Sequence, residues 1–295
     1  MCPYCQNPEK LVKIGFYQRK SDGKKLQRFR CTSCRKSVTE KYWSIDYRLR
    51  KRYLNQRLFR MLCRGLSQRA CAYLLGIHHD TVARRIPLFG RCAALSLEGY
   101  RKTRPKVHTW LIDEMESFEH TKCKPLTMPI AVEEKTRKIL SLRVGRIAAK
   151  GHLAKISRKK YGPRPCERAA CLKAVMQELS ACSLKSVCIK SDESQHYPQP
   201  IKSFFPQARH QSYKGRRACV VGQGELKRGG FDPLFSLNHT YAMIRDNLKR
   251  LSRRTWATTK RPDRLQDLLF LYAYFHNERL DRPKGRISLL WPIPS

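Results

Sequence analysis

Two aspartates in this sequence follow apolar runs that are typical of buried strands. Asp113 lies within "HTWLIDEMESF", and Asp192 ends "SVCIKSD". Carboxylates at neighbouring strand positions repel each other unless a cation lies between them, and Mg²⁺ prefers such oxygen ligands. Two metal ions held about 4 Å apart by shared carboxylates can activate a water or a 3′-hydroxyl for attack on phosphate. Either aspartate taken alone would more simply be a strand-end acid paired with an arginine.

A third candidate for chemistry lies in "FSLNHTYAMIRDNLKRLSRRTWATTK", residues 235–260. Five apolar residues recur there at steps of three and four, which predicts one stripe of an amphipathic helix: Leu237, Tyr241, Ile244, Leu248 and Leu251. The neighbouring face carries Asn238, Arg245 and Lys249. The helix therefore offers one uncharged oxygen ligand and two cations.

The composition indicates a polyanionic partner. The chain has 295 residues with 62 Lys plus Arg against 23 Asp plus Glu, a net charge of +39. So many like charges repel one another and add nothing to a fold, so the composition favours a nucleic acid as the binding partner. The competing classes are a ribosomal-type structural protein and a protein that binds anionic membranes. A hydrophobic content of 41% argues against a disordered basic tail, and no run is long and apolar enough to span a bilayer. The start, "MCPYCQNPEK", has no apolar core, so we expect a cytoplasmic protein without a membrane partner.

Four of the thirteen cysteines have metal-ligand spacing. Cys2 and Cys5, and then Cys31 and Cys34, form two Cys-x2-Cys pairs with 25 residues between them. Four thiolates suit one structural Zn²⁺ and leave no open position for a substrate. The intervening residues predict a basic β-hairpin that turns at Ser21–Gly23. Coincidental spacing is the alternative, and an odd number of cysteines in a chain that we expect to be cytoplasmic argues against a disulfide framework.

"QRACAYLLGIHHDTVARRI", residues 68–86, has the pattern of a helix-turn-helix. Ala72 is small where two helices would cross, Gly76 suits a turn with positive φ, and Val82 is a core position of the second helix. Pro87 is expected to end that helix. An ordinary helical hairpin is the alternative. The following residues would face the major groove or phosphates: His79, Asp80, Thr81, Arg84 and Arg85.

The remaining sequence predicts an α/β domain. Strands are expected in "VHTWLIDEMESF", "LTMPIAVEE" and "KILSLRVGRI", a basic loop at 150–165, and a helix from about Glu167 to Ser180. A second amphipathic helix is expected in "RLQDLLFLYAYFHNERL". The predicted domains are 1–45 with the cysteine pairs, 46–100 with the helix-turn-helix, and 101–295.

These motifs together resemble the DDE-type insertion-sequence transposases with an N-terminal zinc ribbon. "CPYC…RFRCTSCRKSV" is similar to their ribbon, "LIDE" and "CIKSDESQHY" to the strands that carry their first two catalytic acids, and "NHTYAMIRDNLKRLSRRTWATTK" to their terminal catalytic helix. The resemblance implies an α/β, ribonuclease-H-like catalytic core behind the zinc ribbon and the all-α helix-turn-helix. It implies that Asp113 and Asp192 are catalytic metal ligands, that Asn238 stands at the third position, and that Lys260 is the downstream catalytic lysine.

The Asn238 amide carbonyl can coordinate Mg²⁺ or Mn²⁺ but brings no charge, so we expect weaker metal affinity than with Glu. Glu225 and Asp232 are alternative third ligands, although both fall in Gly-rich loop sequence, which positions a ligand poorly.

The expected function is a transposase that binds terminal inverted repeats and target double-stranded DNA, cuts and rejoins DNA with Mg²⁺ or Mn²⁺, and acts as a homo-oligomer on DNA. Its expected DNA contacts are His79, Thr81, Arg84, Arg85, Arg245 and Lys249. Two alternatives remain open: a catalytically inactive DNA-binding regulator, and a metal-dependent nuclease or Holliday-junction resolvase on the same core.

Overall fold

A computed structural model describes residues 1–7, 11–20, 23–44, 47, 49–214, 232–252, 256–285 and 287. The chain divides into two compact units, one within Met1–Tyr53 and one within Leu54–Leu290. No helix among the described residues is long and apolar enough to cross a membrane.

The first unit is a small antiparallel sheet. Its strands are β1 (Leu11–Gln18), β2 (Lys25–Cys31) and β3 (Ser37–Thr39), in the order β1-β2-β3, followed by the 3-10 helix η1 (Glu40–Trp43). Leu11 pairs with Cys31 and Gln18 with Lys25, so the predicted hairpin is confirmed. Gly23 has a φ of +66°, whereas Ser21 and Asp22 lie outside the described residues.

The second unit begins with the 3-10 turn η2 (Arg52–Leu54) at its boundary and three helices, α1 (Asn55–Leu62), α2 (Gln68–Leu75) and α3 (His79–Thr103). Ser67 caps α2 by accepting a hydrogen bond from the Ala70 N–H at 3.1 Å. Gly76 has a φ of +59°, as the turn requires, and no side-chain atom would obstruct a Cβ there. Two helices joined by a turn at Gly76 are thus present, as both the helix-turn-helix and the ordinary helical hairpin predict.

The second of these helices is much longer than predicted, because Pro87 lies inside α3 and does not end it. Proline removes one backbone hydrogen bond, which costs roughly 3 kcal/mol. Ile86 and Phe89 on either side of it are completely buried, and their packing offsets this loss. Gly90 comes so close to α8 (Pro262–Asp281) that a Cβ would lie 2.6 Å from Cβ of Asp267. The predicted domain boundary at residue 100 falls within α3, which packs along α8 as part of the second unit.

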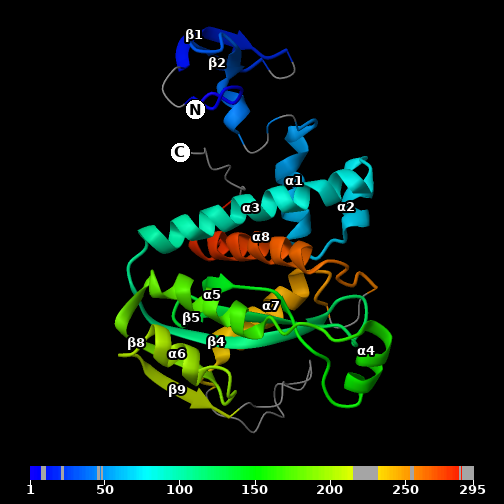
Figure 1. Ribbon diagram of the computed structural model, residues 1–295, viewed down its shortest axis with the longest axis vertical. Helices are drawn as coiled ribbons and strands as arrows, with labels where there is room; N and C mark the ends of the chain where they lie inside the picture. Colours follow the sequence, from blue (N-terminus) through cyan, green and yellow to red (C-terminus); the bar gives the residue numbers. More distant parts are fainter. Residues whose placement is uncertain are drawn as a thin grey trace. The chain divides into compact units, whose positions relative to one another are not determined.

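The centre of the second unit is a mixed sheet (Figure 1). Its strands are β4 (Val107–Phe118), β5 (Pro125–Glu133), β6 (Ile139–Leu142), β7 (Gly145–Arg146), β8 (Ser183–Asp192) and β9 (Arg209–Tyr213). The order is β6-β5-β4-β8-β9, with β7 beside β5. Strands β4, β5 and β6 are antiparallel neighbours, while β4, β8 and β9 run parallel. The longest strand, β4, therefore lies in the middle of the sheet.

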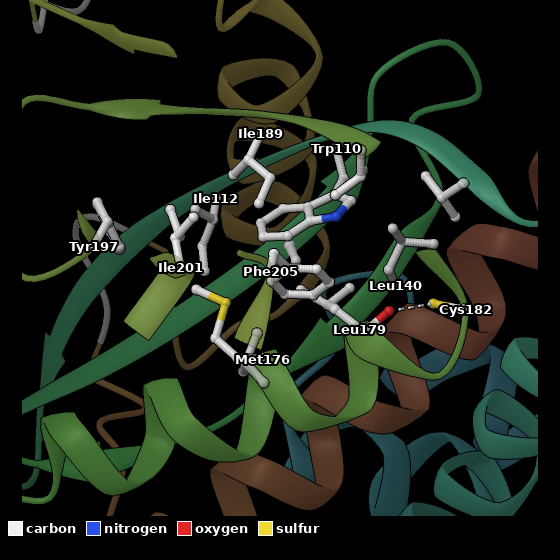
Figure 2. Packing of buried hydrophobic residues seen from close by; sticks show 14 of the residues in the cluster. Trp110, Ile112, Leu140, Met176, Leu179, Cys182, Ile189, Tyr197, Ile201 and Phe205 are labelled. Atoms are coloured by element: carbon white, nitrogen blue, oxygen red, sulfur yellow. Dashed lines mark hydrogen bonds between the residues drawn. The ribbon is translucent and has the colours of Figure 1, made fainter. Parts of the chain in front are cut away.

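Helices cover both faces of this sheet. On one face, α5 (Arg168–Ser180) and α6 (Pro198–Phe204) pack on a core that includes Trp110, Ile112 and Ile189. Figure 2 shows the rings of Trp110 and Phe205 close together in this core, with centroids 5.6 Å apart. Residues of β4 alternate between faces, so Leu111 and Asp113 point to the other side, where α7 (Phe235–Asn247) lies against β4 and β5.

Three elements differ from the sequence prediction. The segment expected to be a basic loop contains α4 (Leu153–Tyr161), in which Ser157 is buried and its hydroxyl donates to the Cys123 carbonyl at 2.6 Å. Neither α6 nor β9 is apparent in the sequence, because both are short and β9 is almost wholly polar. The predicted strands at β4, β5 and β8 and the predicted helices at α5 and α8 are confirmed.

Candidate functional site

The sheet brings Asp113 and Asp192 together. Parallel pairing joins Ile112 of β4 to Ser191 of β8, so the next residues on the two strands are Asp113 and Asp192. Ile112 and Ser191 are buried, and Ile112 belongs to the core under α5. The two aspartate side chains therefore point to the opposite face of the sheet, toward α7.

The pKa of Asp113 is raised to about 6, chiefly by burial. The negative charges of Asp192 and Glu114 contribute to this rise, whereas the Glu114 N–H and the Arg245 guanidinium oppose it. That N–H donates to Asp113 Oδ1 at 2.6 Å. Asp113 and Asp192 thus interact as like charges, and Arg245 of α7 is the nearby cation that offsets part of their repulsion.

Helix α7 is tied directly to the strand that carries Asp113. The hydroxyl of the buried Tyr241 donates to the Asp113 carbonyl. Burial and the Asp113 carboxylate both raise the pKa of Tyr241, so the phenol stays protonated and remains a donor. On α7, Asn238 lies one turn before Tyr241, and Arg245 lies one turn after it. This hydrogen bond therefore fixes the positions of both residues along β4.

Asn238 is exposed on the first turn of α7 and has a carboxylate partner. Its amide Nδ2 donates to Asp232 Oδ2 at 2.9 Å, while Asp232 Oδ1 accepts from the Leu234 N–H at 2.9 Å. The sequence prediction places Asp232 in a Gly-rich loop, although an Asp followed by Pro just before a helix is a helix-start signal. Glu225, the other alternative, lies outside the described residues.

The two downstream lysines do not lie on α7. The helix ends at Asn247, so Leu248 and Leu251 are buried beyond it, and Lys249 and Lys260 are exposed in the following connection. Lys260 Nζ is 3.4 Å from His120 Nδ1, just past the end of β4. Asp113 lies in the middle of that strand, several residues before its end, and a strand advances about 3.3 Å per residue. The structure therefore does not bring Lys260 beside the acid pair.

The acids on the other face of β4, Glu114 and Glu116, form hydrogen bonds and ion pairs within the fold. Glu114 Oε2 accepts hydrogen bonds from Arg168 Nε and from Thr127 Oγ1, both at 2.7 Å. Arg168 also contacts Glu116. These carboxylates are neutralised from α5, which distinguishes them from the Asp113–Asp192 pair.

The four predicted zinc ligands lie together in the first unit. The sulfur atoms of Cys2 and Cys34 are 3.6 Å apart, as are those of Cys5 and Cys31. All four lie within 4.8 Å of one another. A Zn–S distance of 2.3 Å in a tetrahedron places sulfurs about 3.8 Å apart, so the arrangement fits one Zn²⁺. Hydrogen bonding from the Cys34 N–H lowers the pKa of the Cys31 thiol, whereas burial and the neighbouring thiols raise the pKa of Cys34, so the four sulfurs do not ionise alike without a metal.

The start of α3 presents part of the predicted DNA-facing surface. His79 and Arg84 are exposed and Thr81 is partly exposed. His78, His79 and Asp80 also form a group of potential metal ligands at the surface, and the His78 Nδ1 accepts from the Asp80 N–H at 3.3 Å to cap the helix. This end of α3 is therefore accessible to a partner.

The prediction that Arg85 faces DNA is wrong, because its side chain is only 3% exposed. Val82, Arg85, Ile86 and Phe89 follow the spacing of a buried helical face, and all four are buried. That spacing was visible in the sequence but was outweighed by the charge of arginine. Burial lowers the pKa of Arg85.

No protein-family model matches this chain, and no curated protein matches it. Among solved structures, it is similar to the catalytic domain of Mos1 mariner transposase, with 10% identity over 68% of this chain and 91% of that chain and a TM-score of 0.26. It is also similar to a chain of the simian T-cell lymphotropic virus intasome in complex with PP2A regulatory subunit B56 gamma (13% identity, 81% and 76% coverage, TM-score 0.31). A third similar structure is the Mos1 strand transfer complex, with 12% identity over 80% of this chain and 78% of that chain and a TM-score of 0.25. Identities and TM-scores this low do not establish a shared fold or function.

Proposed function

We propose that this protein is a DNA transposase of the DDE type, with Asn238 at the third catalytic position. The observation that carries the proposal is the placement of Asp113 and Asp192 on adjacent parallel strands, on the face that α7 covers. A chain with a net charge of +39 offers few acids, and cations that hold DNA beside acids that hold metal are what phosphodiester chemistry needs.

The strand arrangement supports a ribonuclease-H-like core. Three antiparallel strands are followed by two parallel ones, and the first strand, β4, is central. This order places the first acid in the middle of the sheet and the second at the end of the neighbouring strand. Both positions are those expected for the catalytic acids of the transposase family that the sequence resembles.

The donor set fits Mg²⁺ or Mn²⁺, since carboxylate and amide oxygens are the ligands such ions prefer. Asp113 and Asp192 would hold the ion, with Asn238 or Asp232 contributing at the start of α7. When bound, the metal supplies activation of a water or 3′-hydroxyl and stabilisation of the leaving oxygen. Arg245 compensates part of the acid pair's charge, and Tyr241 keeps α7 in register with Asp113.

DNA recognition is assigned to the first unit and to the helix-turn-helix. The cysteine cluster would hold a structural Zn²⁺, and the exposed His79, Thr81 and Arg84 would contact terminal inverted repeats. Lys249 and Lys260, which are exposed in the connection after α7, are assigned to the backbone of the bound or target DNA. We further propose that the chain acts on the DNA as a homo-oligomer, which would bring the two ends together.

The test is a strand-transfer assay on the DNA that flanks the gene, after its ends have been searched for inverted repeats. Wild type should give joined products with Mg²⁺, and Asp113→Ala or Asp192→Ala should lower the rate of joining at least about 100-fold. Even the mutation of a residue that only hydrogen-bonds to a metal ligand lowers activity about 10- to 100-fold, so the loss of a ligand itself should cost more. Asp246→Ala, an exposed acid on α7, is the matched control and should retain activity. Undiminished joining in either active-site variant would refute the assignment.

Other outcomes of the same assay identify the alternatives. Cleavage without joining indicates a nuclease or resolvase, and DNA binding without cleavage indicates a regulator. Asn238→Glu tests the third position: the variant should reach half-maximal activity at lower Mg²⁺ than wild type, because it adds a negative charge. An equal or higher Mg²⁺ requirement in the variant would exclude Asn238 as a ligand.

A further inference from the structure

A groove of about 500 Å³ lies in the second unit, on a part of the surface that the acid pair does not use. One side is formed by Leu66 of the α1–α2 connection and Arg69 of α2, and the start of α3 adds His79. The connection between α7 and α8 forms the other side, with Lys249, Trp256 and Lys260. The groove therefore joins the helix-turn-helix to the segment that follows α7.

Trp256 is the unusual residue of this groove, because its side chain is fully exposed at 101%. Trp110, by comparison, is completely buried in the core. A large indole that none of the described residues covers is a stacking surface for another flat group. The connection is braced beside it, since Arg250 Nη1 donates to the Thr258 carbonyl at 3.2 Å.

The lining combines an apolar base with cations. Leu62, Leu248 and Leu268 contribute the apolar part, whereas Arg69, Lys249 and Lys260 are exposed. Among the described residues that line the groove there is no carboxylate. A ligand that fits has a flat, partly apolar group and carries negative charge, which is the chemistry of a nucleotide within a DNA strand.

The size selects an unpaired nucleotide over duplex DNA. The volume lies in the range of about 300–1,000 Å³ that is typical of small-ligand sites, and the bases of a paired, stacked duplex are not free to stack on an indole. We propose that this groove receives an unpaired nucleotide of the bound DNA, with its base stacked on Trp256 and its phosphates contacting Lys249 and Lys260. The inference rests on the proposed function, because a protein that cuts and joins DNA must hold strand ends.

The experiment compares two labelled DNAs, a blunt duplex and the same duplex with a short single-stranded 3′ overhang. Binding by the full-length protein is measured without added divalent cation, so that no chemistry occurs. Wild type should bind the overhang DNA more tightly by about 5- to 150-fold per stacked base. Trp256→Ala should abolish this preference without changing the affinity for the blunt duplex, and Trp256→Phe should retain most of it.

Tyr161→Ala is the matched control, because Tyr161 of α4 is another exposed aromatic residue and does not line the groove; it should leave the preference unchanged. Equal affinity of wild type for the two DNAs, or an equal loss for both in Trp256→Ala, would overturn the inference. The outcome is separable from that of the strand-transfer assay. Strand transfer without an overhang preference refutes the groove alone, whereas an overhang preference in a protein that performs no strand transfer refutes the proposed function alone.

Discussion

Replacing Asp113 with asparagine should stabilise the fold at neutral pH. The pKa of Asp113 is raised from 3.8 to about 6, chiefly by burial, so the folded protein holds its proton more tightly than the unfolded chain does. The stabilising effect of that proton is complete below the unfolded pKa and is lost as pH rises through the folded pKa. A shift of about two pKa units corresponds to about 3 kcal/mol. Without metal, the ionised Asp113 lowers the free energy of unfolding by up to that amount.

The assay is urea unfolding without added divalent cations, followed by tryptophan fluorescence, to which the buried Trp110 contributes. At about pH 8, Asp113→Asn should be more stable than wild type by up to about 3 kcal/mol. At about pH 4.5, Asp113 is largely protonated in the folded protein, so the free energy of unfolding of wild type rises by about 2 kcal/mol. The difference in stability between Asp113→Asn and wild type is therefore smaller at this pH than at about pH 8.

Asp246→Asn makes the same substitution at an exposed acid of α7 and should show no difference from wild type at either pH. The reasoning fails if Asp113→Asn is less stable than wild type at the higher pH, or if the difference does not shrink on acidification. Added Mg²⁺ should stabilise wild type but not the variant, by about 1.4 kcal/mol at ten times its dissociation constant.

Three further predictions concern packing and zinc. Gly90→Ala should lower the free energy of unfolding by about 1–3 kcal/mol, because its Cβ would collide with α8, whereas Gly99→Ala in the same helix meets nothing and should raise it by about 0.5–1 kcal/mol. Urea titrations check both. Glu178→Ala should lower the free energy of unfolding by about 3–5 kcal/mol, since it leaves the buried Arg101 of α3 without its carboxylate partner. The same urea titration measures this, and a loss below about 1 kcal/mol would contradict it. Elemental analysis should find about one zinc per chain, a content that Cys31→Ser lowers and that Cys166→Ser, at an exposed cysteine outside the cluster, leaves unchanged.

Elements with strong local signals could be predicted from the sequence. The strand around Asp113 is a long apolar run, and the strand that ends at Asp192 is a shorter one, so both stood out against a basic background. Gly76 was predictable for a similar reason, because a turn with positive φ between two helices requires glycine. What the sequence alone could not supply is the register that pairs Ile112 with Ser191, since pairing between distant strands leaves no local signal.

The errors arose where tertiary packing outweighs local preference. Pro87 is a strong helix breaker, yet the burial of Ile86 and Phe89 carries α3 through it. Arg85 was assigned to DNA by its charge, although its helical position is on the buried face. The catalytic role of Lys260 stays a prediction, since α7 ends at Asn247 and the chain then carries Lys260 to the far end of β4.

The charges around Asp113 offer a physical reason for an asparagine at the third position. Asp113 and Asp192 bring two negative charges, and Arg245 on α7 returns one positive charge. Asp232, which accepts from Asn238 Nδ2 at 2.9 Å, adds a third negative charge at the start of α7. Under the proposed function, one divalent cation then leaves these groups with no net charge. A glutamate at position 238 would make them net negative and would repel the phosphate, so the asparagine trades metal affinity for a weaker repulsion of the DNA. Asn238→Glu should therefore lower both the Mg²⁺ requirement and the affinity for DNA at saturating Mg²⁺. A variant that gains metal affinity with no loss of DNA affinity would contradict this charge balance.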